Sequence, residues 1–433
     1  AVEPVIRYQR GRFRGAEQSR PGSMRYELGL QVRQDVLHRL TDVWATGEAG
    51  ASLGFMTARL FDELDPLEKV KFKLLEEKGI SGRGELKLFK EVNGRAIELV
   101  KLRAKPDGER DEKRVAELEA DPLVRYAILD SAGAVLCPAT KLWNTGHGAT
   151  VMREAVSLMG GYGITEDCPG FLGNKWMDAQ LEATYEGPEA VQRRQLSVCM
   201  QNEVFLAQFE TWTKELRQIA SDRPDTGACT LASAMTLWLY SYNHLQVAKD
   251  AAGEKLYQGP RQGVTFSLSD ALAWLMAARA LVLDTLELEK KGAESAVVAD
   301  GLAGLVQFYQ DLAHVQSARA SGEVGRICAE LVYGYNKHPT WDEDERKKCY
   351  DATELDALED LIPGIASCAT DVIAADGSHP PKAGPCANCV SLGDFAALRM
   401  KLDGCLTGAR LSKDRAADAL AKVMIPEALD YPV

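Results

Sequence analysis

The spacing of apolar residues is the feature that most constrains this sequence. Apolar side chains recur at intervals of three and four residues along most of the chain, which is the period of one α-helical face. Two clear examples are Leu28, Val32, Val36, Leu40, Val43 and Trp44, and then Ala232, Met235, Leu239, Tyr242 and Leu245. Alternating runs of apolar and polar residues, which would indicate strands, are nearly absent. The pattern predicts an all-α protein.

The length of 433 residues is enough for two or three packed units. The best domain boundary is the polar segment 221–227, which holds a proline and a glycine and precedes a fresh helix. We therefore expect a helical domain over residues 1–222, similar to a four-helix bundle, and a second helical bundle over 223–433. Residues 79–121 are charged and broken by glycine and proline. They predict a partly helical insertion on the surface.

Charge and cysteine usage narrow the class of protein. A net charge of −12 repels a phosphate backbone, so we expect no nucleic-acid partner. The most apolar run, 271–286, is interrupted by Arg279 and Asp284, so it predicts a buried helix rather than a membrane span. Ten scattered cysteines without a signal peptide do not indicate a secreted disulfide framework, which points to a reducing, cytoplasmic compartment.

A basic segment opens the chain with Arg10-Gly11-Arg12-Phe13. A guanidinium can make two parallel hydrogen bonds to a pyrophosphate, and an adjacent aromatic ring can lie against a base or a sugar. Taken alone, the same residues are more typical of a solvated basic terminus.

A glycine-rich turn follows an expected helix that begins near Ala149. The turn is Gly160-Gly161-Tyr162-Gly163, and its bare backbone would let a flat or phosphorylated ligand approach main-chain amides. Taken alone, a glycine at the end of a helix is also an ordinary C-cap.

A carboxylate lies on a tight turn between two expected helices, in Thr184-Tyr185-Glu186-Gly187-Pro188. A rigid, desolvated carboxylate has a raised pKa and can remove a proton from a weakly acidic carbon. The alternative is a glutamate that simply interacts with the positive end of a helix.

The order of these motifs resembles the carboxy-terminal helical domain of the acyl-CoA dehydrogenase family, of the large type with an extra C-terminal helical region. Arg-x-x-Phe is followed by a helix into Gly-Gly-Tyr-Gly, then Ile164-Thr165-Glu166-Asp167-Cys168-Pro169, Met177-Asp178-Ala179 and Tyr185-Glu186-Gly187. The resemblance is close over residues 139–195 and loose over 5–60.

This resemblance implies a cofactor, a reaction and roles for particular residues. FAD would lie between subunits, held by Arg10, Phe13, Gly160, Gly161 and Gly163. Glu186 would remove the α-proton of an acyl-CoA thioester of fatty acid metabolism, while hydride passes from the β-carbon to flavin N5. Tyr185 and Gly187 would contact the substrate, and electrons would leave to an electron-transfer flavoprotein.

The sequence departs from the family pattern at three positions. The usual glutamine before the glycine turn is Ser157, and the usual Arg-Asp-Ala begins with Met177. Pro188 stands where the family commonly has a threonine that contacts the flavin, and proline has neither a hydroxyl nor an amide hydrogen.

The family's amino-terminal helical domain and β-barrel-like middle domain have no counterpart in this sequence. We therefore expect either a companion chain that carries them or a longer polypeptide of which this is a part, and a homo- or hetero-oligomer. The leading hypothesis is a flavin-dependent dehydrogenase subunit. Two alternatives remain: a non-catalytic structural subunit that helps to hold a partner's FAD, and a metal-dependent helical redox subunit.

Two further positions bear on those alternatives. Cys386 and Cys389 have the spacing of a metal-binding pair, with Cys368, His379 and Cys405 near them in sequence, but a structural site needs four ligands. We predict ordinary cysteines and no metal. A lone histidine such as His147 is more often a capping or surface residue, so we do not place it in the site.

Overall fold

The computed structural model describes residues 2–10, 33–165, 168, 171–185, 187–250, 253–335 and 387–427. The α-helices are α1 Val2–Arg10, α3 Gln34–Glu77, α4 Arg83–Arg103, α5 Glu112–Ala120, α6 Pro122–Leu142, α7 Gly148–Leu158, α8 Leu172–Glu182, α9 Glu189–Cys199, α10 Glu203–Asp222, α11 Ala228–Val247, α12 Gln262–Lys291, α13 Leu302–Tyr333, α17 Ala387–Gly404 and α18 Ala409–Glu427.

Short helical segments of other types join some of them. One is a π-helix, η2 Trp143–His147, and the others are 3₁₀ turns at η3 Gly160–Ile164, η5 Pro224–Thr226 and η6 Gly292–Glu294. Within the described ranges the only β-type pairing is an isolated bridge between Lys249 and Lys255. The prediction of an all-α fold is confirmed.

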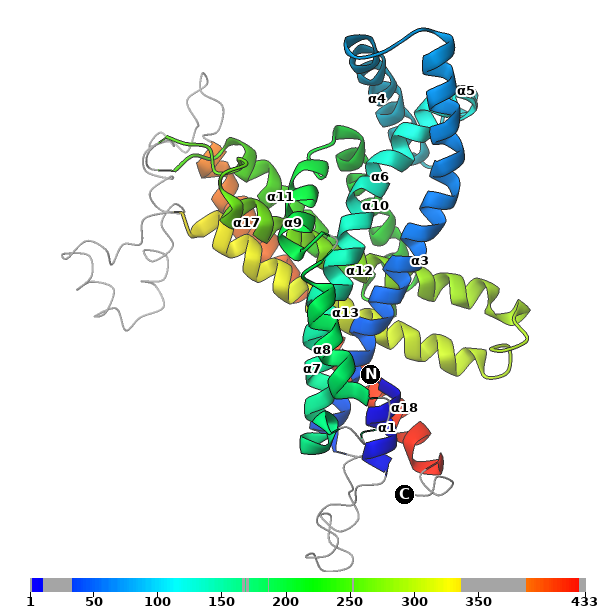
Figure 1. Ribbon diagram of the computed structural model, residues 1–433, viewed down its shortest axis with the longest axis vertical. Helices are drawn as coiled ribbons and strands as arrows, with labels where there is room; N and C mark the ends of the chain where they lie inside the picture. Colours follow the sequence, from blue (N-terminus) through cyan, green and yellow to red (C-terminus); the bar gives the residue numbers. More distant parts are fainter. Residues whose placement is uncertain are drawn as a thin grey trace, which may run out of the picture.

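The longest helix, α3, forms the spine of the molecule. Its 44 residues would extend over about 66 Å at 1.5 Å per residue, and Figure 1 shows it beside α6 along the long axis. Leu40, Leu53 and Leu67 are buried at successive levels of α3, each in a different hydrophobic cluster. Three clusters therefore share one helix.

The largest cluster forms around α11, α12 and α13. Helix α12, with η6, is long and apolar enough to cross a membrane, but 72% of its most apolar stretch is buried among the other helices, which is the environment of a core helix. The Trp238 indole donates to the carbonyl oxygen of Leu268 at 3.0 Å and locks α11 against α12.

The polar junction expected as a domain boundary lies between α10 and α11. Helix α10 ends at Asp222, and Gly227 adopts a left-handed conformation (φ 74°) before α11 begins. Phe209 and Trp238, on either side of the junction, have ring centroids 4.8 Å apart in the same core cluster. The two segments thus share one core, and their division into domains at 222/223 stays a prediction.

The segment expected as an insertion forms α4 and α5 and has its own small core. Leu99 and Leu118 are fully buried there, and Val204 at the start of α10 belongs to the same cluster. At the end of the segment, the Asp121 carboxylate accepts from the backbone N–H of Leu123 at 2.8 Å, and Pro122 occupies the first helical turn of α6. This pair of helices lies at the end of the molecule opposite α1 (Figure 1).

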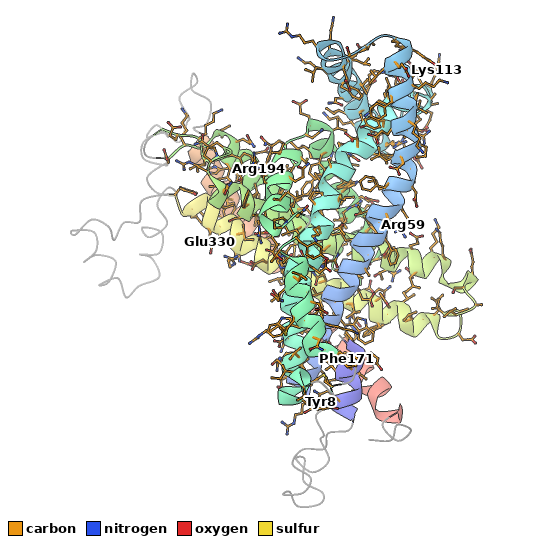
Figure 2. The ribbon with its side chains drawn as sticks, viewed as in Figure 1. Tyr8, Arg59, Lys113, Phe171, Arg194 and Glu330 are labelled. Atoms are coloured by element: carbon orange, nitrogen blue, oxygen red, sulfur yellow. The ribbon has the colours of Figure 1, made fainter. Side chains whose placement is uncertain are left out.

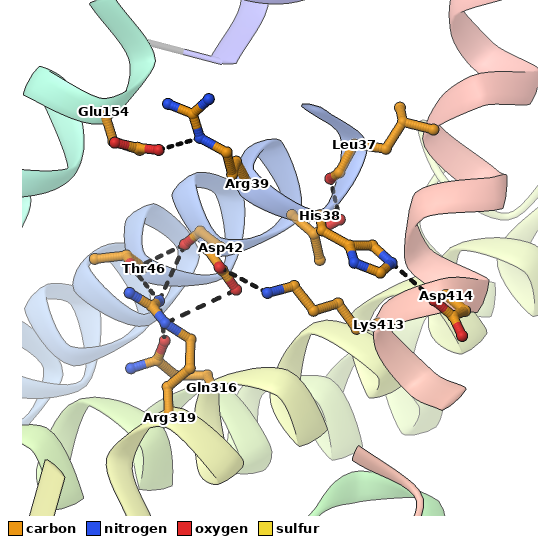
Figure 3. A network of polar contacts seen from close by, with 11 residues as sticks. Leu37, His38, Arg39, Asp42, Thr46, Glu154, Gln316, Arg319, Lys413 and Asp414 are labelled. Carbon is orange, nitrogen blue, oxygen red and sulfur yellow. Dashed lines mark hydrogen bonds and ion pairs between the residues drawn. The ribbon is translucent and has the colours of Figure 1, made fainter. Parts of the chain in front are cut away.

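A polar network fixes the other end, where α3 meets α13 and α18 (Figure 3). Asp42 on α3 accepts from the ammonium of Lys413 at 2.7 Å. Arg319 on α13 donates to the Asp42 carbonyl oxygen at 3.1 Å and to the hydroxyl of Thr46. The His38 ring lies 2.7 Å from the Asp414 carboxylate. The C-terminal helix is thus held by side chains as well as by apolar contact.

Candidate functional site

The glycine turn follows directly from the end of α7. Gly160 has a left-handed conformation (φ 63°), and a Cβ placed on Gly161 would meet nothing within 4 Å. Gly163 differs: it is buried, and a Cβ there would lie 2.6 Å from the carbonyl oxygen of Val156. Gly160 and Gly161 therefore present bare backbone outward, whereas Gly163 is required by packing against α7.

Helix α1 covers one side of this turn. The rings of Tyr8 and Tyr162 stack with centroids 5.7 Å apart and planes inclined at 26°. The amide of Gln9 donates to the Leu158 carbonyl oxygen at 2.6 Å. The backbone of Arg10, the next residue, thus ends α1 beside the turn. The Arg10 side chain and Phe13 lie outside the described residues, so their expected roles stay predictions.

The turn between α8 and α9 contains the second group of predicted residues. Gly187 has a left-handed conformation (φ 89°), and its carbonyl oxygen accepts from the side-chain amide of Gln192 at 2.9 Å. The Tyr185 side chain is 39% exposed, and the Lys141 ammonium lies 5.1 Å from its ring centre. Glu186 lies outside the described residues, so its expected role as a base is a prediction.

Pro188 is the N-cap residue of α9 and provides no side-chain hydrogen bond. Its carbonyl oxygen accepts from the backbone N–H of Val191 at 2.7 Å, so it still closes the first turn of the helix. A threonine at this position could cap with its hydroxyl. The sequence departure at Pro188 therefore removes a polar side chain from the entrance of α9.

A π-helical segment lies against this same entrance. It joins α6 to α7, and a Cβ on its Gly146 would lie 3.1 Å from Oε1 of Glu189, the first residue of α9. A π-type turn inserts an extra residue into a helix and often occurs at functional sites. Here the absence of a side chain at Gly146 lets α9 approach closely.

His147 ends the π-helical segment and lies between two tryptophans. Its ring centre is 4.9 Å from that of Trp143 and 4.8 Å from that of Trp274. Burial lowers the pKa of His147 to about 4, with the Glu323 carboxylate acting in the opposite direction, so the ring is neutral at neutral pH. His147 therefore lies at the N-cap position of α7, one of the two positions expected for it, and packs in an aromatic cluster with Trp143 of η2 and Trp274 of α12.

The first turns of α9 are tied to α12 by charged groups. The Arg193 guanidinium bonds to Glu189 at 2.9 Å and to Asp270 at 2.8 Å, and all three side chains are about one-quarter exposed. Burial raises the pKa of the Asp270 carboxyl above its usual value, and Arg193 counteracts that effect. The chain Glu189–Arg193–Asp270 fixes the helix that follows the Tyr185–Pro188 turn.

The two turns lie at opposite ends of a helical pair. Helices α7 and α8 pack against each other; the glycine turn is at one end, and η2 with the Tyr185–Pro188 turn is at the other. Eleven helical residues separate the ends, which corresponds to about 16 Å. Figure 2 shows Tyr8 and Phe171 near the glycine-turn end of the molecule. A ligand that touched both turns would have to be elongated.

Comparison with known families identifies the segment that holds both turns. Residues 124–199 match the model of the acyl-CoA dehydrogenase C-terminal domain. The segment is similar to the C-terminal domain of the acyl-CoA dehydrogenase family. The matched segment runs from the start of α6 to the end of α9 and contains the π-helix, the glycine turn and the Tyr185–Pro188 turn.

Wider comparisons concern the whole chain. A crystal structure of an acyl-CoA dehydrogenase complexed with FAD from Bacillus anthracis matches with a TM-score of 0.45 and 13% identity, over 92% of this chain and 54% of that one. The chain thus spans about half the length of that acyl-CoA dehydrogenase. No curated protein matches the sequence.

Metal ligands do not gather anywhere in the described part of the chain: it holds no group of three or more histidine, cysteine, aspartate or glutamate side chains suited to a metal ion. Cys386, Cys368 and His379 lie outside the described residues, as does the side chain of Cys389, so the prediction that they bind no metal is untested.

Several residues around the site were not found from the sequence. No sequence motif marked four of them, because their contacts join segments far apart in the chain. These four are Gly146, Glu189, Arg193 and Asp270. The contact between Trp143 and His147 could have been predicted, since aromatic residues four apart on a helix lie on the same face.

Proposed function

We propose that this chain is the C-terminal helical part of an FAD-dependent acyl-CoA dehydrogenase that oxidises an acyl-CoA thioester between its α and β carbons. The observation that carries the proposal is the family match over residues 124–199, which contains Glu186 and both turns. The chain's net charge of −12 also argues against a nucleic-acid partner.

The described residues at the glycine turn fit a dinucleotide such as FAD. Gly160 and Gly161 leave main-chain atoms open to a flat or phosphorylated group, and the Tyr8–Tyr162 ring pair borders them. We assign Gly160 and Gly161 to cofactor binding, with Arg10 and Phe13 following from the family resemblance. Gly163 would act indirectly, by allowing the turn to pack against α7.

The proposed chemistry centres on a proton at the α-carbon of the thioester. That proton is very weakly acidic, so its removal needs a fixed, desolvated carboxylate, which we assign to Glu186. The two residues that follow Glu186 support a fixed position: the Gly187 carbonyl oxygen accepts a hydrogen bond from Gln192, and Pro188 precedes a helix anchored through Arg193. When bound, FAD supplies the acceptor for the hydride that leaves the β-carbon. Tyr185 and Gly187 would line the thioester site.

A companion that carries the remaining domains is part of this proposal. The chain spans about half the length of the solved acyl-CoA dehydrogenase, and the apolar side chains of Met177 and Leu181, one turn apart on α8, are 68% and 61% exposed. We propose that a companion chain or a preceding part of the same polypeptide covers them, that the assembly is oligomeric and cytoplasmic, and that an electron-transfer flavoprotein accepts its electrons.

One observation favours a second candidate, a structural subunit that holds a partner's FAD without catalysing the reaction. Pro188 provides no side-chain hydrogen bond at the entrance of α9, where the family resemblance led us to expect a threonine. Loss of that contact would weaken flavin alignment while leaving the helical architecture intact.

The first experiment purifies the chain together with its natural companion and measures subunit masses and flavin absorption. The proposal expects FAD in the assembly and bleaching of its absorption band when an acyl-CoA thioester is added without oxygen. An assembly without flavin would contradict FAD binding.

The second experiment compares Glu186→Gln with a matched control in the same assembly. The control is Glu182→Gln, which removes a half-exposed carboxylate four residues earlier in the sequence, at the end of α8. We expect Glu186→Gln to retain FAD and to lose bleaching by at least about a hundredfold, the size of a typical general-base effect, while the control bleaches at the normal rate. Equal bleaching in both variants would favour the structural subunit.

A further inference from the structure

Two cysteines from distant parts of the chain lie in contact outside the matched segment 124–199. Cys229 is in the first turn of α11, and Cys405 is in the turn between α17 and α18. Their Sγ atoms are 3.7 Å apart. The sulfurs would have to approach by only about 1.7 Å to reach the length of a disulfide bond.

The backbone around Cys405 is held against α11 by two side chains. The Thr230 hydroxyl donates to the carbonyl oxygen of Cys405 at 2.6 Å. The Ser233 hydroxyl lies 3.2 Å from the Cys405 sulfur and donates to the Cys229 carbonyl oxygen at 3.0 Å. These contacts hold Cys229 and Cys405 in place, so the two sulfurs lie close together even though no disulfide bond joins them.

Exposure distinguishes the two thiols. Cys229 is exposed, whereas Cys405 is only partly accessible. A small disulfide in solution can therefore reach Cys229 first, and Cys405 is in position to attack the Cys229 sulfur afterwards. An accessible thiol with an adjacent resolving thiol can close a disulfide by way of a mixed disulfide.

We propose that Cys229 and Cys405 form a reversible disulfide by exchange with a low-molecular-weight disulfide. The Cys229 thiolate attacks one sulfur of that disulfide, giving a mixed disulfide and releasing one small thiolate. The Cys405 thiolate then attacks the Cys229 sulfur, forms the protein disulfide and releases the second small thiolate. The two protein thiols are oxidised, the small disulfide is reduced to two thiols, and the two protein protons pass to them.

The bond would link the α17–α18 turn to α11. In a reducing compartment the pair rests as two thiols, and oxidation would close a covalent loop from residue 229 to residue 405. Burial, together with the neighbouring Cys405, raises the pKa of the Cys229 thiol, so exchange should accelerate as pH rises from neutral.

The test incubates the chain with oxidised glutathione and maps its peptides without reduction. We expect one peptide pair joined through Cys229 and Cys405, with the mass of two hydrogen atoms missing. In Cys405→Ser the first step should still occur and stop, leaving Cys229 as a stable adduct with glutathione. Cys137→Ser, which removes another exposed cysteine, should form the same joined pair as the wild type.

The proposal is overturned if the joined pair is absent from the wild type at every glutathione ratio, or if Cys229 joins a different cysteine. The wild-type map decides this even if a variant fails to fold. Neither result bears on Glu186 or FAD, so the outcome is independent of the proposed dehydrogenase function.

Discussion

The guanidinium of Arg193 bonds to the carboxylate of Asp270 at 2.8 Å and so joins the helix after the Tyr185–Pro188 turn to the central core helix. Arg193 also bonds to Glu189 in the first turn of its own helix. One side chain thereby sets the position of α9 relative to α12. Any ligand site at the turn depends on that position.

Replacing this arginine should destabilise the protein more than breaking a surface ion pair. Arg193→Met leaves the Asp270 carboxylate partly buried without its cation, and we expect a loss of about 2 kcal/mol in the free energy of unfolding. Lys291→Met breaks the exposed pair with Glu287 and should cost less than about 0.5 kcal/mol. Denaturant unfolding measures both, and equal losses would refute the anchoring role.

The glycine turn offers a paired test of packing against exposure. Gly163→Ala would place a Cβ 2.6 Å from the Val156 carbonyl oxygen and should destabilise the protein by about 2–4 kcal/mol. Gly161→Ala meets nothing within 4 Å and should change stability by less than about 0.5 kcal/mol. Thermal unfolding of the two variants checks the difference. A neutral Gly163→Ala would mean that the turn is looser than described.

The partly buried His147 should make the protein sensitive to mild acid. The pKa of His147 is lowered from 6.5 to about 4, so between these values the unfolded chain binds a proton that the folded chain does not. Stability should therefore fall as pH drops through this window, by up to ~3 kcal/mol from this residue.

The comparison for this prediction is His147→Gln against wild type at the same pH values. Burial also lowers the pKa of His244 and His314, which act in the same direction, whereas the raised pKa of Asp270 acts in the opposite one. The variant should lose less stability between pH 6.5 and 5 than the wild type does. Identical slopes would show that His147 is already solvated.

The polar network at the end of α3 should hold the C-terminal helix in place. Asp42→Ala leaves Lys413 without its carboxylate and also removes the carboxylate 3.9 Å from Arg319, whose pKa is lowered by burial. We expect a loss of about 2–4 kcal/mol and faster amide hydrogen exchange in α18. The control is Glu77→Ala, which removes an exposed carboxylate from the same helix. Unchanged exchange in α18 would contradict the network's role.

Local sequence signals predicted the helices well because their ends are set by nearby residues. The expected helix start near Ala149 lies one residue from the observed Gly148, and the helix expected after the Thr184–Pro188 turn begins at Glu189. The polar segment 221–227 overlaps the last two residues of α10 and then separates it from α11. Caps, prolines and glycines act over a few residues, so they can be recognised without the fold.

The shared contacts could not be predicted, since they join residues far apart in the chain. The sequence treated Gly160, Gly161 and Gly163 alike, but only packing against α7 shows that Gly163 faces inward. His147 does lie at a helix cap, as expected, but its contact with the partly buried ring of Trp274, on α12, could not be predicted. The family resemblance indicated the candidate site residues, and the fold showed the contacts that hold the described ones in place.

The length of α3 has a consequence for how this protein unfolds. Three hydrophobic clusters contain residues of α3. If one cluster unfolds, part of α3 loses its packing, and the other two clusters are destabilised because they pack on the same helix. Heating should therefore unfold these clusters in a single sharp transition and not in separate steps. The cooperativity of unfolding would then depend on the continuity of α3.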